Sequence, residues 1–164
     1  MNTPIKILRA TVVVSAAIVM LTGCFDKLAA PQCTPVSSAQ ASSNGDTVTT
    51  TTGLRYIEGT TGSGLVVSWC HNIAIHYDAF LADGTKFDSS RDLAQPLVFA
   101  PGLGGLIDGL EQGVIGMHGG GKRRLIIPPG LAFGSEAKRD ANGQVIVPGN
   151  STLVYDIEII QVAQ

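Results

Sequence analysis

The sequence lacks an excess of positive charge. Its 164 residues include 11 Lys and Arg against 13 Asp and Glu, which gives a formal net charge of −2 at pH 7. Proteins that bind nucleic acid neutralise phosphates with lysine and arginine side chains, and this chain has no surplus of them to form a broad cationic field. Nucleic acid is therefore not expected as a partner.

The chain also lacks an apolar run long enough to span a membrane. The stretch TVVVSAAIVML at 11–21 has 11 residues, whereas a membrane-spanning helix needs about 20. It follows a basic start with Lys6 and Arg9, which is the layout of an export signal. A signal sequence is therefore favoured over a membrane-spanning helix.

The motif Leu21-Thr22-Gly23-Cys24 comes at the end of this apolar stretch and resembles the bacterial lipobox. The resemblance implies a lipoprotein signal peptide over 1–23 and a lipidated mature N-terminus at Cys24; the alternative is an ordinary secretory signal with an incidental cysteine. Several acyl chains anchor a protein more firmly than one. Phe25 follows the cysteine where an inner-membrane protein of Gram-negative bacteria would have aspartate, which favours the outer membrane, facing the periplasm.

Cysteine is scarce, with three residues in the chain. If Cys24 is lipidated, Cys33 and Cys70 remain in an oxidising compartment, where a disulfide between them would pin the N-terminal segment to the folded part. The alternative is a buried Cys70 in a strand, with Cys33 free or paired elsewhere. No CxxC occurs, and no zinc-ligand spacing is repeated. No metal is therefore expected at the candidate ligands Cys70, His71, His76 and His118.

Residues 24–52 are rich in Ser, Thr, Ala, Gln and Pro and have no apolar periodicity, which predicts a tether. From Gly53 onward, apolar and polar residues alternate as in half-buried strands. No internal repeat is evident, and no second domain fits after residue 53. The sequence therefore predicts one domain over 53–164.

The clearest strand places Ile73, Ile75, Tyr77 and Ala79 on one face. The following Asp83-Gly84 pair predicts a primed two-residue hairpin turn, in which both residues adopt positive φ, with a second strand through Lys86 and Phe87.

Further strands are expected at 97–99, at KRRLIIP (122–128) and at TLVYDIEIIQV (152–162). A loop at 128–148 is expected between the last two. The spacing of Leu106, Ile107, Leu110 and Val114 predicts a helix, which the glycines at 109, 113 and 116 keep short. Antiparallel strands with one short helix predict an α+β fold, in which a curved sheet wraps the helix.

Three stretches carry a family resemblance: IHYDAFLADGTKFDSS (75–90), GLIDGLEQGVIGMHGGGKRRLIIPPGLAFG (105–134) and VPGNSTLVYDIEII (147–160). They resemble, in order and spacing, the motifs of the FKBP-type peptidyl-prolyl cis-trans isomerases. The resemblance implies a half-open antiparallel sheet of five to six strands around one short helix. It also implies an apolar pocket that receives a proline ring.

The resemblance also implies site residues, position by position. Those matching the catalytic positions are Asp88, Tyr77, Phe87, Ile107 and Phe133. Those matching substrate-binding positions are Leu97, Phe99, Leu106, Leu110, Ile146, Val147 and Tyr155. The apolar members could instead be ordinary core, and Asp88 could be an ordinary turn residue, although burial of a carboxylate is costly without partners. The chain departs from the usual pattern at Leu110, Phe133 and Tyr155, where many members have tryptophan, tyrosine and phenylalanine.

Rotation about an Xaa-Pro amide makes no covalent bond, so no cofactor is expected, and catalysis requires only preferential binding of the twisted amide. Asp88 is expected to act electrostatically or by orienting Tyr77. Relatives commonly supply donors from the tyrosine at the position of Phe133 and from the backbone N–H at Ile107. Because Phe133 has no hydroxyl, one hydrogen bond is missing, which predicts reduced turnover.

The expected partners are proline-containing polypeptides, with membrane contact through the N-terminal lipid only and a monomeric state. The alternatives are a non-enzymatic proline-segment binding module or chaperone, and a purely structural lipoprotein. For a binding module, the polar loop at 128–148 could select partners, although a merely solvated loop is the simpler interpretation.

Overall fold

The computed structural model describes residues 42–44, for the backbone alone, and residues 47–163. Cys24 and Cys33 lie outside the described residues, so the predicted signal peptide, lipidation and disulfide pairing stay predictions. Cys70 is disulfide-bonded and has a φ of 69°. Among the described residues, no helix is long and apolar enough to cross a membrane.

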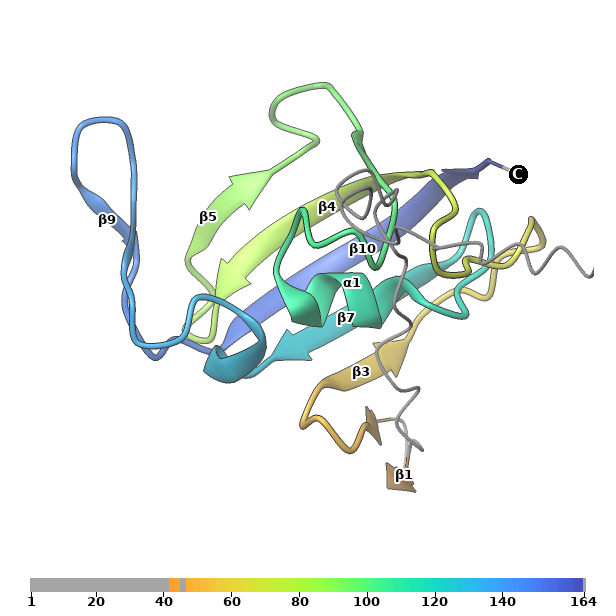
Figure 1. Cartoon of the computed structure of the whole chain (residues 1–164), viewed down its shortest axis with the longest axis horizontal. Coiled ribbons are helices and arrows are strands. Elements are labelled where there is room, and N and C mark those ends of the chain that lie inside the picture. Colours follow the sequence, from red (N-terminus) through yellow and green to blue (C-terminus); the bar gives the residue numbers. More distant parts are fainter. Residues whose placement is uncertain (1–41, 45–46, 164) are drawn as a thin grey trace, which may run out of the picture. The chain divides into compact units, whose positions relative to one another are not determined.

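Eight of the ten described strands form one antiparallel sheet, in the order β1-β2-β3-β7-β10-β4-β5, with β6 pairing with β4 (Figure 1). The strands are β1 (Ser42–Asn44), β2 (Thr47–Thr49), β3 (Arg55–Glu58), β4 (Ile73–Leu81), β5 (Lys86–Ser89), β6 (Leu97–Phe99), β7 (Lys122–Ile127) and β10 (Leu153–Val162). Helix α1 (Asp108–Val114) lies against this sheet. The predicted α+β fold class, an antiparallel sheet around one short helix, is confirmed.

The sheet begins earlier than the sequence analysis expected. Strand β2 pairs with β3, opposing Thr47 to Ile57 and Thr49 to Arg55. Both β1 and β2 therefore lie within the stretch 24–52 that was interpreted as a tether, and they bring the strand count above five to six. Short polar strands such as TVT carry too little apolar alternation to be distinguished from a linker.

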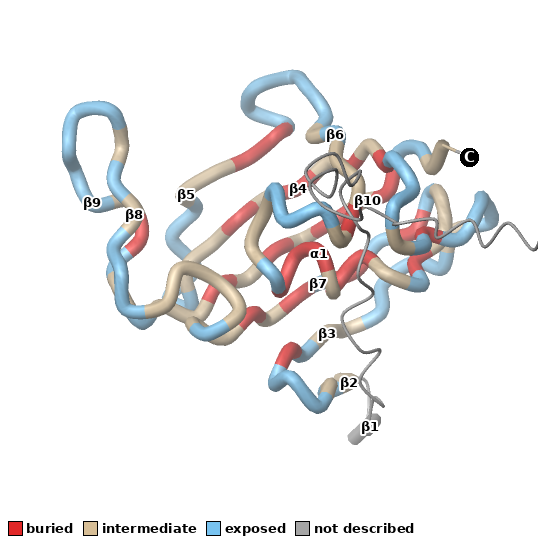
Figure 2. Tube along the Cα trace, in the orientation of Figure 1, coloured by how far each residue is buried: buried red, intermediate tan, exposed pale blue. Residues whose placement is uncertain are grey.

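The core lies between α1 and the inner face of the sheet. In β4 and β10, alternate residues are buried, as the period-two pattern predicts (Figure 2). The buried residues of these strands are Ile73, Ile75, Tyr77, Ala79, Leu153, Tyr155, Ile157 and Ile159. Each large apolar side chain buried in this way stabilises the fold by about 1.5–3 kcal/mol. The outer face of the same strands carries charged and polar residues together with apolar ones such as Phe80 and Ile160.

Two glycines let α1 approach β7 closely. A Cβ at Gly109 would overlap Ile127, and one at Gly113 would overlap Leu125. From the sequence, these glycines predicted only that the helix is short. Their larger role is to remove the side chains that would hold the helix away from the sheet, at a helix-propensity cost of about 1 kcal/mol each.

Arg123 holds the other end of the helix. Its buried guanidinium donates to the carbonyls of Gly113 at 2.6 Å and Ile115 at 3.2 Å, where the helix leaves carbonyls unpaired. The same group pairs with Glu58 and lies 4.3 Å from the centre of the Tyr56 ring. One side chain of β7 thus connects the helix to β3.

The β4–β5 turn differs from the predicted primed turn. Gly84 has a φ of 90°, but Asp83 is not among the residues with positive φ. The Gly84 N–H donates to Leu81 O at 3.0 Å and the Leu81 N–H donates to Thr85 O at 2.8 Å. This pattern is a type I turn followed by a glycine bulge, a three-residue hairpin. The predicted hairpin is present, and its turn type was wrong.

The predicted loop at 128–148 contains regular structure. A 3-10 turn, η1, spans Pro129–Leu131, and a two-stranded hairpin pairs β8 (Lys138–Arg139) with β9 (Val145–Val147). In Figure 1 this hairpin projects from the end of the sheet.

Candidate active site

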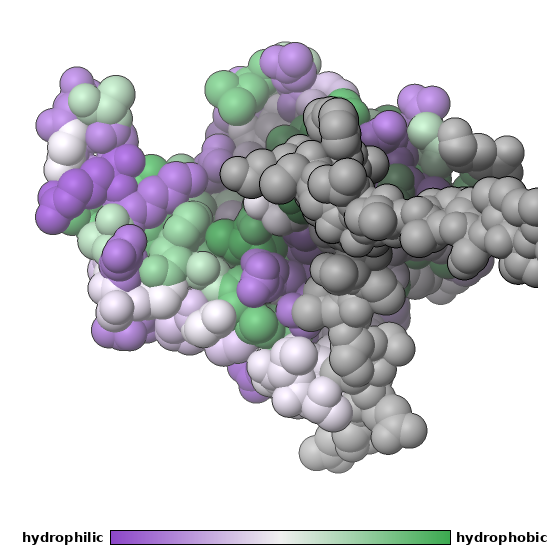
Figure 3. All heavy atoms as spheres, in the orientation of Figure 1, coloured by the Kyte–Doolittle hydropathy of each residue, from purple (hydrophilic) through white to green (hydrophobic). Residues whose placement is uncertain are grey.

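A cavity of about 400 Å³ lies between the start of α1 and the sheet. Its lining comes from β4, β5, β6, β8 and β10, from α1 and the residues just before it, and from the segment after η1. The lining residues are Tyr77, Asp88, Leu97, Gly105, Leu106, Ile107, Asp108, Leu110, Ala132, Phe133, Lys138 and Tyr155. Figure 3 shows apolar side chains gathered in the middle of this face, beside the polar β8–β9 hairpin. The shape and lining suit a small apolar ring with a few polar contacts.

Eight of the twelve residues predicted for the site line this cavity: Tyr77, Asp88, Leu97, Leu106, Ile107, Leu110, Phe133 and Tyr155. Four predicted residues are not among the lining residues. Phe87 packs edge-on against Tyr155, with ring centres 6.2 Å apart. Phe99 is half-buried in β6, opposite Ile73. On β9, Val147 is buried in the core and Ile146 is half-buried.

Asp88 is held by two donors. The Tyr77 hydroxyl donates to its Oδ2 at 3.0 Å, and the Ser89 N–H donates to its Oδ1 at 2.9 Å. Burial, followed by the hydrogen bond to Asp88 and its charge, raises the pKa of Tyr77 to about 12. Tyr77 therefore stays a neutral donor at physiological pH, and Asp88 accepts both a backbone N–H of its own strand β5 and a side chain of the pocket.

Tyr155 stands at the inner wall of the cavity. Its ring centre lies 5.7 Å from that of Tyr77, with the ring planes tilted by 37°. Burial raises the pKa of Tyr155, and the nearby Tyr77 and Asp88 raise it further. Three rings, those of Tyr77, Phe87 and Tyr155, thus form an aromatic wall beside the Asp88 carboxylate.

The entry to α1 is held by a buried glutamate. Glu111 is 4% exposed, and its two carboxylate oxygens accept the N–H groups of Gly102 at 2.9 Å and Leu106 at 3.0 Å. This pair of bonds fixes the 101–106 segment to the helix and so positions Leu106 and Ile107 at the cavity. The Ile107 N–H donates no hydrogen bond within the described residues, which leaves it available to a ligand.

Sequence reasoning missed four lining residues: Gly105, Asp108, Ala132 and Lys138. Lys138 is the one cation among the residues that line the cavity, and its Nζ lies 5.3 Å from the centre of the Phe133 ring. It reaches the cavity because β8 pairs with β9, with Lys138 opposite Val147. No sequence pattern indicated that pairing.

A second hollow of about 410 Å³ adjoins the first and shares Tyr77 and Leu97 with it. Its rim includes Leu93, which is 71% exposed, and Val98, which is 64% exposed. Together the two hollows offer an apolar surface longer than a single ring.

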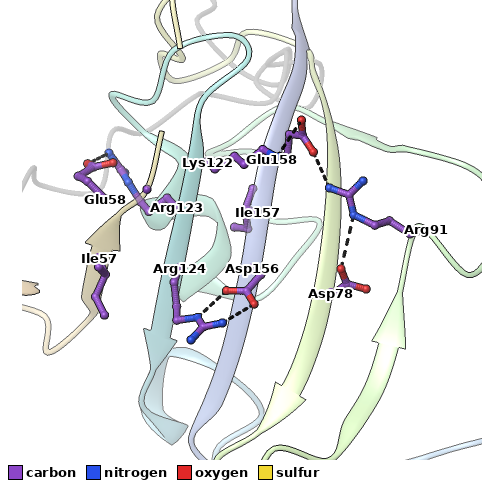
Figure 4. Close-up of a pocket in the computed structure, with 11 residues that line it drawn as sticks. Ile57, Glu58, Asp78, Arg91, Lys122, Arg123, Arg124, Asp156, Ile157 and Glu158 are labelled. Carbon is purple, nitrogen blue, oxygen red and sulfur yellow. Dashed lines mark hydrogen bonds and ion pairs between the residues drawn. The ribbon is translucent and has the colours of Figure 1, made fainter. Parts of the chain in front are cut away.

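A third hollow, of about 340 Å³, lies over the strands β3, β7, β10 and β4 (Figure 4). Its charged side chains are paired with one another. Arg124 binds Asp156 through two hydrogen bonds of 2.6 and 2.7 Å, and Arg91 binds Glu158 at 2.5 Å and Asp78 at 3.5 Å. Because the lining charges already have partners, this hollow is a weaker candidate for binding than the apolar cavity.

An antiparallel sheet around one short helix, with an apolar cavity between them that holds a tyrosine-bound carboxylate, places this chain among the small α+β domains. The sequence profile of the FKBP-type peptidyl-prolyl cis-trans isomerases, FKBP_C, matches residues 70–160. The chain belongs to this family.

Curated relatives agree with this assignment. An FK506-binding protein of Neisseria meningitidis serogroup C is 42% identical over 90 residues, which cover 55% of this chain and 78% of that protein. FK506-binding protein 2 of Dictyostelium discoideum is 47% identical over 88 residues, covering 54% and 62%. The chloroplastic photosynthetic NDH subunit of lumenal location 4 of Arabidopsis thaliana is 47% identical over 96 residues, covering 55% and 44%. The chain thus spans about half the length of several of its relatives.

Solved structures share the fold. AtFKBP13 matches with a TM-score of 0.66 and 35% identity, over 71% of this chain and 98% of that one. FkpA from Escherichia coli matches with a TM-score of 0.63 and 34% identity, over 73% of this chain and 53% of that one. The predicted FKBP-like fold is confirmed.

Proposed function

We propose that the chain accelerates cis-trans isomerisation of Xaa-Pro bonds and assists the folding of proteins in a bacterial cell envelope. The observation that carries this proposal is the apolar cavity with Asp88 held by the Tyr77 hydroxyl, in a chain of the isomerase family. The uncatalysed reaction takes tens of seconds or longer, so catalysis has a clear advantage in folding.

The cavity favours the twisted amide by shape and by exclusion of water. The proline ring enters between Leu97, Leu110 and the rings of Tyr77 and Tyr155, where little water can solvate the planar, more polar ground state. The free Ile107 N–H donates to a carbonyl oxygen of the bound segment. Asp88 contributes a fixed negative charge beside the twisting amide and holds Tyr77 in place.

The second hollow extends the substrate beyond the proline. A peptide whose proline fills the cavity passes over Tyr77 and Leu97 and lays a neighbouring side chain against Leu93 and Val98. Because these two residues are apolar and exposed, an apolar neighbour is preferred.

The test is a protease-coupled or NMR exchange assay on a series of Xaa-Pro peptides, with the wild-type chain and Asp88→Ala. We expect isomerisation by the wild type and a lower kcat/KM for the variant, with an unchanged circular dichroism spectrum. A flat wild-type result would remove the enzymatic proposal. Unchanged turnover in Asp88→Ala would remove the role of Asp88 alone.

A second candidate is a binding module or chaperone that grips proline-containing segments without isomerising them. Phe133 favours it, because the cavity lacks the hydroxyl that relatives commonly carry at this position. Suppression of aggregation of an unfolded protein, measured beside isomerisation on the same preparation, separates the two. Protection without isomerisation supports the module.

The anchoring at Cys24 belongs to the same proposal and is supported by the lipobox resemblance of 21–24. Metabolic labelling with a radioactive fatty acid should label the wild-type chain and the Cys70→Ser variant, and should fail with Cys24→Ser. Fractionation then tests the outer membrane, and mass spectrometry of an unreduced digest tests the Cys33–Cys70 pair. A monomeric state is expected in light scattering.

A further inference from the structure

The Tyr155 hydroxyl has no hydrogen-bond partner within the described part of the chain, although the residue is 6% exposed. The hydroxyl oxygen is not completely buried, and Tyr155 lines the cavity. The hydroxyl therefore meets the open space of the cavity. Buried tyrosines usually bond their hydroxyl, and leaving such a group unsatisfied is costly. An unused donor therefore faces the site.

The neighbouring polar groups are already engaged. The Tyr77 hydroxyl donates to Asp88 Oδ2, and the Ser89 N–H donates to Asp88 Oδ1. The ring of Tyr155 cannot easily turn elsewhere, because Tyr77 packs at 5.7 Å and Phe87 at 6.2 Å between ring centres. The hydroxyl is thus fixed in direction before any ligand arrives, which lowers the entropy cost of a hydrogen bond to that ligand.

The cavity has one hydroxyl more than expected at Tyr155 and one fewer at Phe133. Both residues line the same cavity of about 400 Å³, Phe133 from the segment after η1 and Tyr155 from β10. A donor lost from one wall is therefore matched by a donor on another wall. Burial and the nearby carboxylate keep the Tyr155 phenol protonated, so it donates at any physiological pH.

We infer that Tyr155 is a catalytic residue. Its hydroxyl donates a hydrogen bond to a carbonyl oxygen of the bound prolyl segment and so replaces the hydroxyl that Phe133 lacks. This inference rests on the proposed function. It replaces the expectation of reduced turnover, because the number of donors in the cavity is preserved. The combination of Phe133 and Tyr155 then changes only the position of the donor, which lies on β10 and not on the segment after η1.

The experiment uses the full-length chain with three variants: Tyr155→Phe, Phe133→Tyr, and the two combined. Tyr155→Phe removes one oxygen and keeps the ring, so kcat/KM should fall about 2- to 13-fold, the equivalent of one net hydrogen bond. Phe133→Tyr should restore most of the activity in the Tyr155→Phe background, and its effect on kcat/KM should be larger there than in the wild-type background. The matched control is Tyr56→Phe, whose ring lies by Arg123 outside the cavity, and it should leave kcat/KM unchanged.

Thermal unfolding distinguishes a substrate contact from a structural one. Because the hydroxyl has no partner in the folded chain, Tyr155→Phe should leave Tm unchanged or raise it. A fall in Tm together with the fall in kcat/KM would show a structural role and overturn the inference. So would Tyr155→Phe turnover equal to that of the wild type, or a Phe133→Tyr effect of the same size in both backgrounds.

Failure of the inference can be told apart from failure of the proposed function. If the wild type isomerises no peptide, the proposed function fails, and the anisotropy of a labelled proline-containing peptide tests the hydroxyl by binding alone. A 2- to 13-fold weaker affinity of Tyr155→Phe supports the hydrogen bond. Equal affinities of the two proteins overturn it.

Discussion

The Tyr77 hydroxyl donates to Asp88 across the paired strands β4 and β5, at 3.0 Å. The bond joins an aromatic residue of the inner sheet face to the carboxylate at the sheet edge. Tyr77→Phe should therefore lower kcat/KM by about 2- to 13-fold, because Asp88 loses a donor that fixes its direction. Steady-state assays on one Xaa-Pro peptide measure this. A variant as active as the wild type would contradict the orienting role.

The raised pKa of Tyr77 predicts a pH dependence of stability. Its folded pKa is about 12 and its ordinary value is 10.0. The neutral phenol is favoured by folding, so this contribution to stability is full below pH 10 and is lost as the pH rises from 10 to 12. Urea unfolding at pH 9 to 12 should show a smaller loss for Tyr77→Phe than for the wild type. Parallel curves for the two proteins would contradict it.

Glu111→Gln should reduce both stability and turnover. The amide keeps one acceptor oxygen for the N–H groups of Gly102 and Leu106, and it loses the charge that strengthens both bonds. We expect the free energy of unfolding to fall by about 1–3 kcal/mol and kcat/KM to fall with it, because Leu106 and Ile107 lose their support.

The matched control for Glu111 is Glu136→Gln, an exposed glutamate whose side chain makes no bond within the described residues. Glu136→Gln should change neither the free energy of unfolding nor kcat/KM. If Glu111→Gln is as neutral as this control in urea unfolding and in turnover, the positioning of 101–106 by Glu111 is wrong.

Gly109→Ala should destabilise the fold. The new methyl group would overlap Ile127, a β-branched side chain in a fully buried position, and would come close to the Leu131 carbonyl. Overpacking of this kind costs about 1–3 kcal/mol, which exceeds the helix-propensity gain of about 1 kcal/mol. Gly130→Ala has open space around it and serves as the control in thermal unfolding. An increase in Tm for Gly109→Ala would refute the close helix–sheet contact.

Lys138 should influence which peptides are turned over. It is the one cation among the cavity-lining residues, so Lys138→Glu should lower kcat/KM for peptides with an acidic residue beside the proline and raise it for basic ones, with an effect that fades at high salt. Arg139→Glu, the next residue on β8, is exposed and bonds Gly143, and it makes the same charge change away from the cavity. Equal effects of the two variants would exclude a local role of Lys138.

Period-two alternation made much of the fold predictable. It identified β4 and β10, because one face of each strand must be buried and the other solvated. It failed for β2, a three-residue strand of sequence TVT, which has no buried face of its own. The β4–β5 turn type was also missed, since Asp-Gly pairs occur in hairpins of both two and three residues.

The site was predictable where motifs carry it and not where tertiary contacts do. Asp88, Ile107 and Tyr155 fall inside the recognised stretches. Lys138 reaches the cavity only through the β8–β9 pairing, and Glu111 acts only because the 101–106 segment folds back onto it. A glutamate near the start of a helix has the sequence pattern of a solvated residue, so its burial could not be anticipated.

The contacts of Arg123 set the smallest piece of this chain that can be expected to fold. The family profile begins at residue 70. Arg123, however, is only 8% exposed, and its guanidinium contacts Glu58 and Tyr56 of β3. A fragment that starts at residue 70 would keep the buried Arg123 and lose Glu58. Removing one partner of a buried ion pair is strongly destabilising, because the other charge is left buried without a partner. Expression of an intact domain therefore requires a start before Arg55, upstream of the boundary that sequence similarity alone suggests.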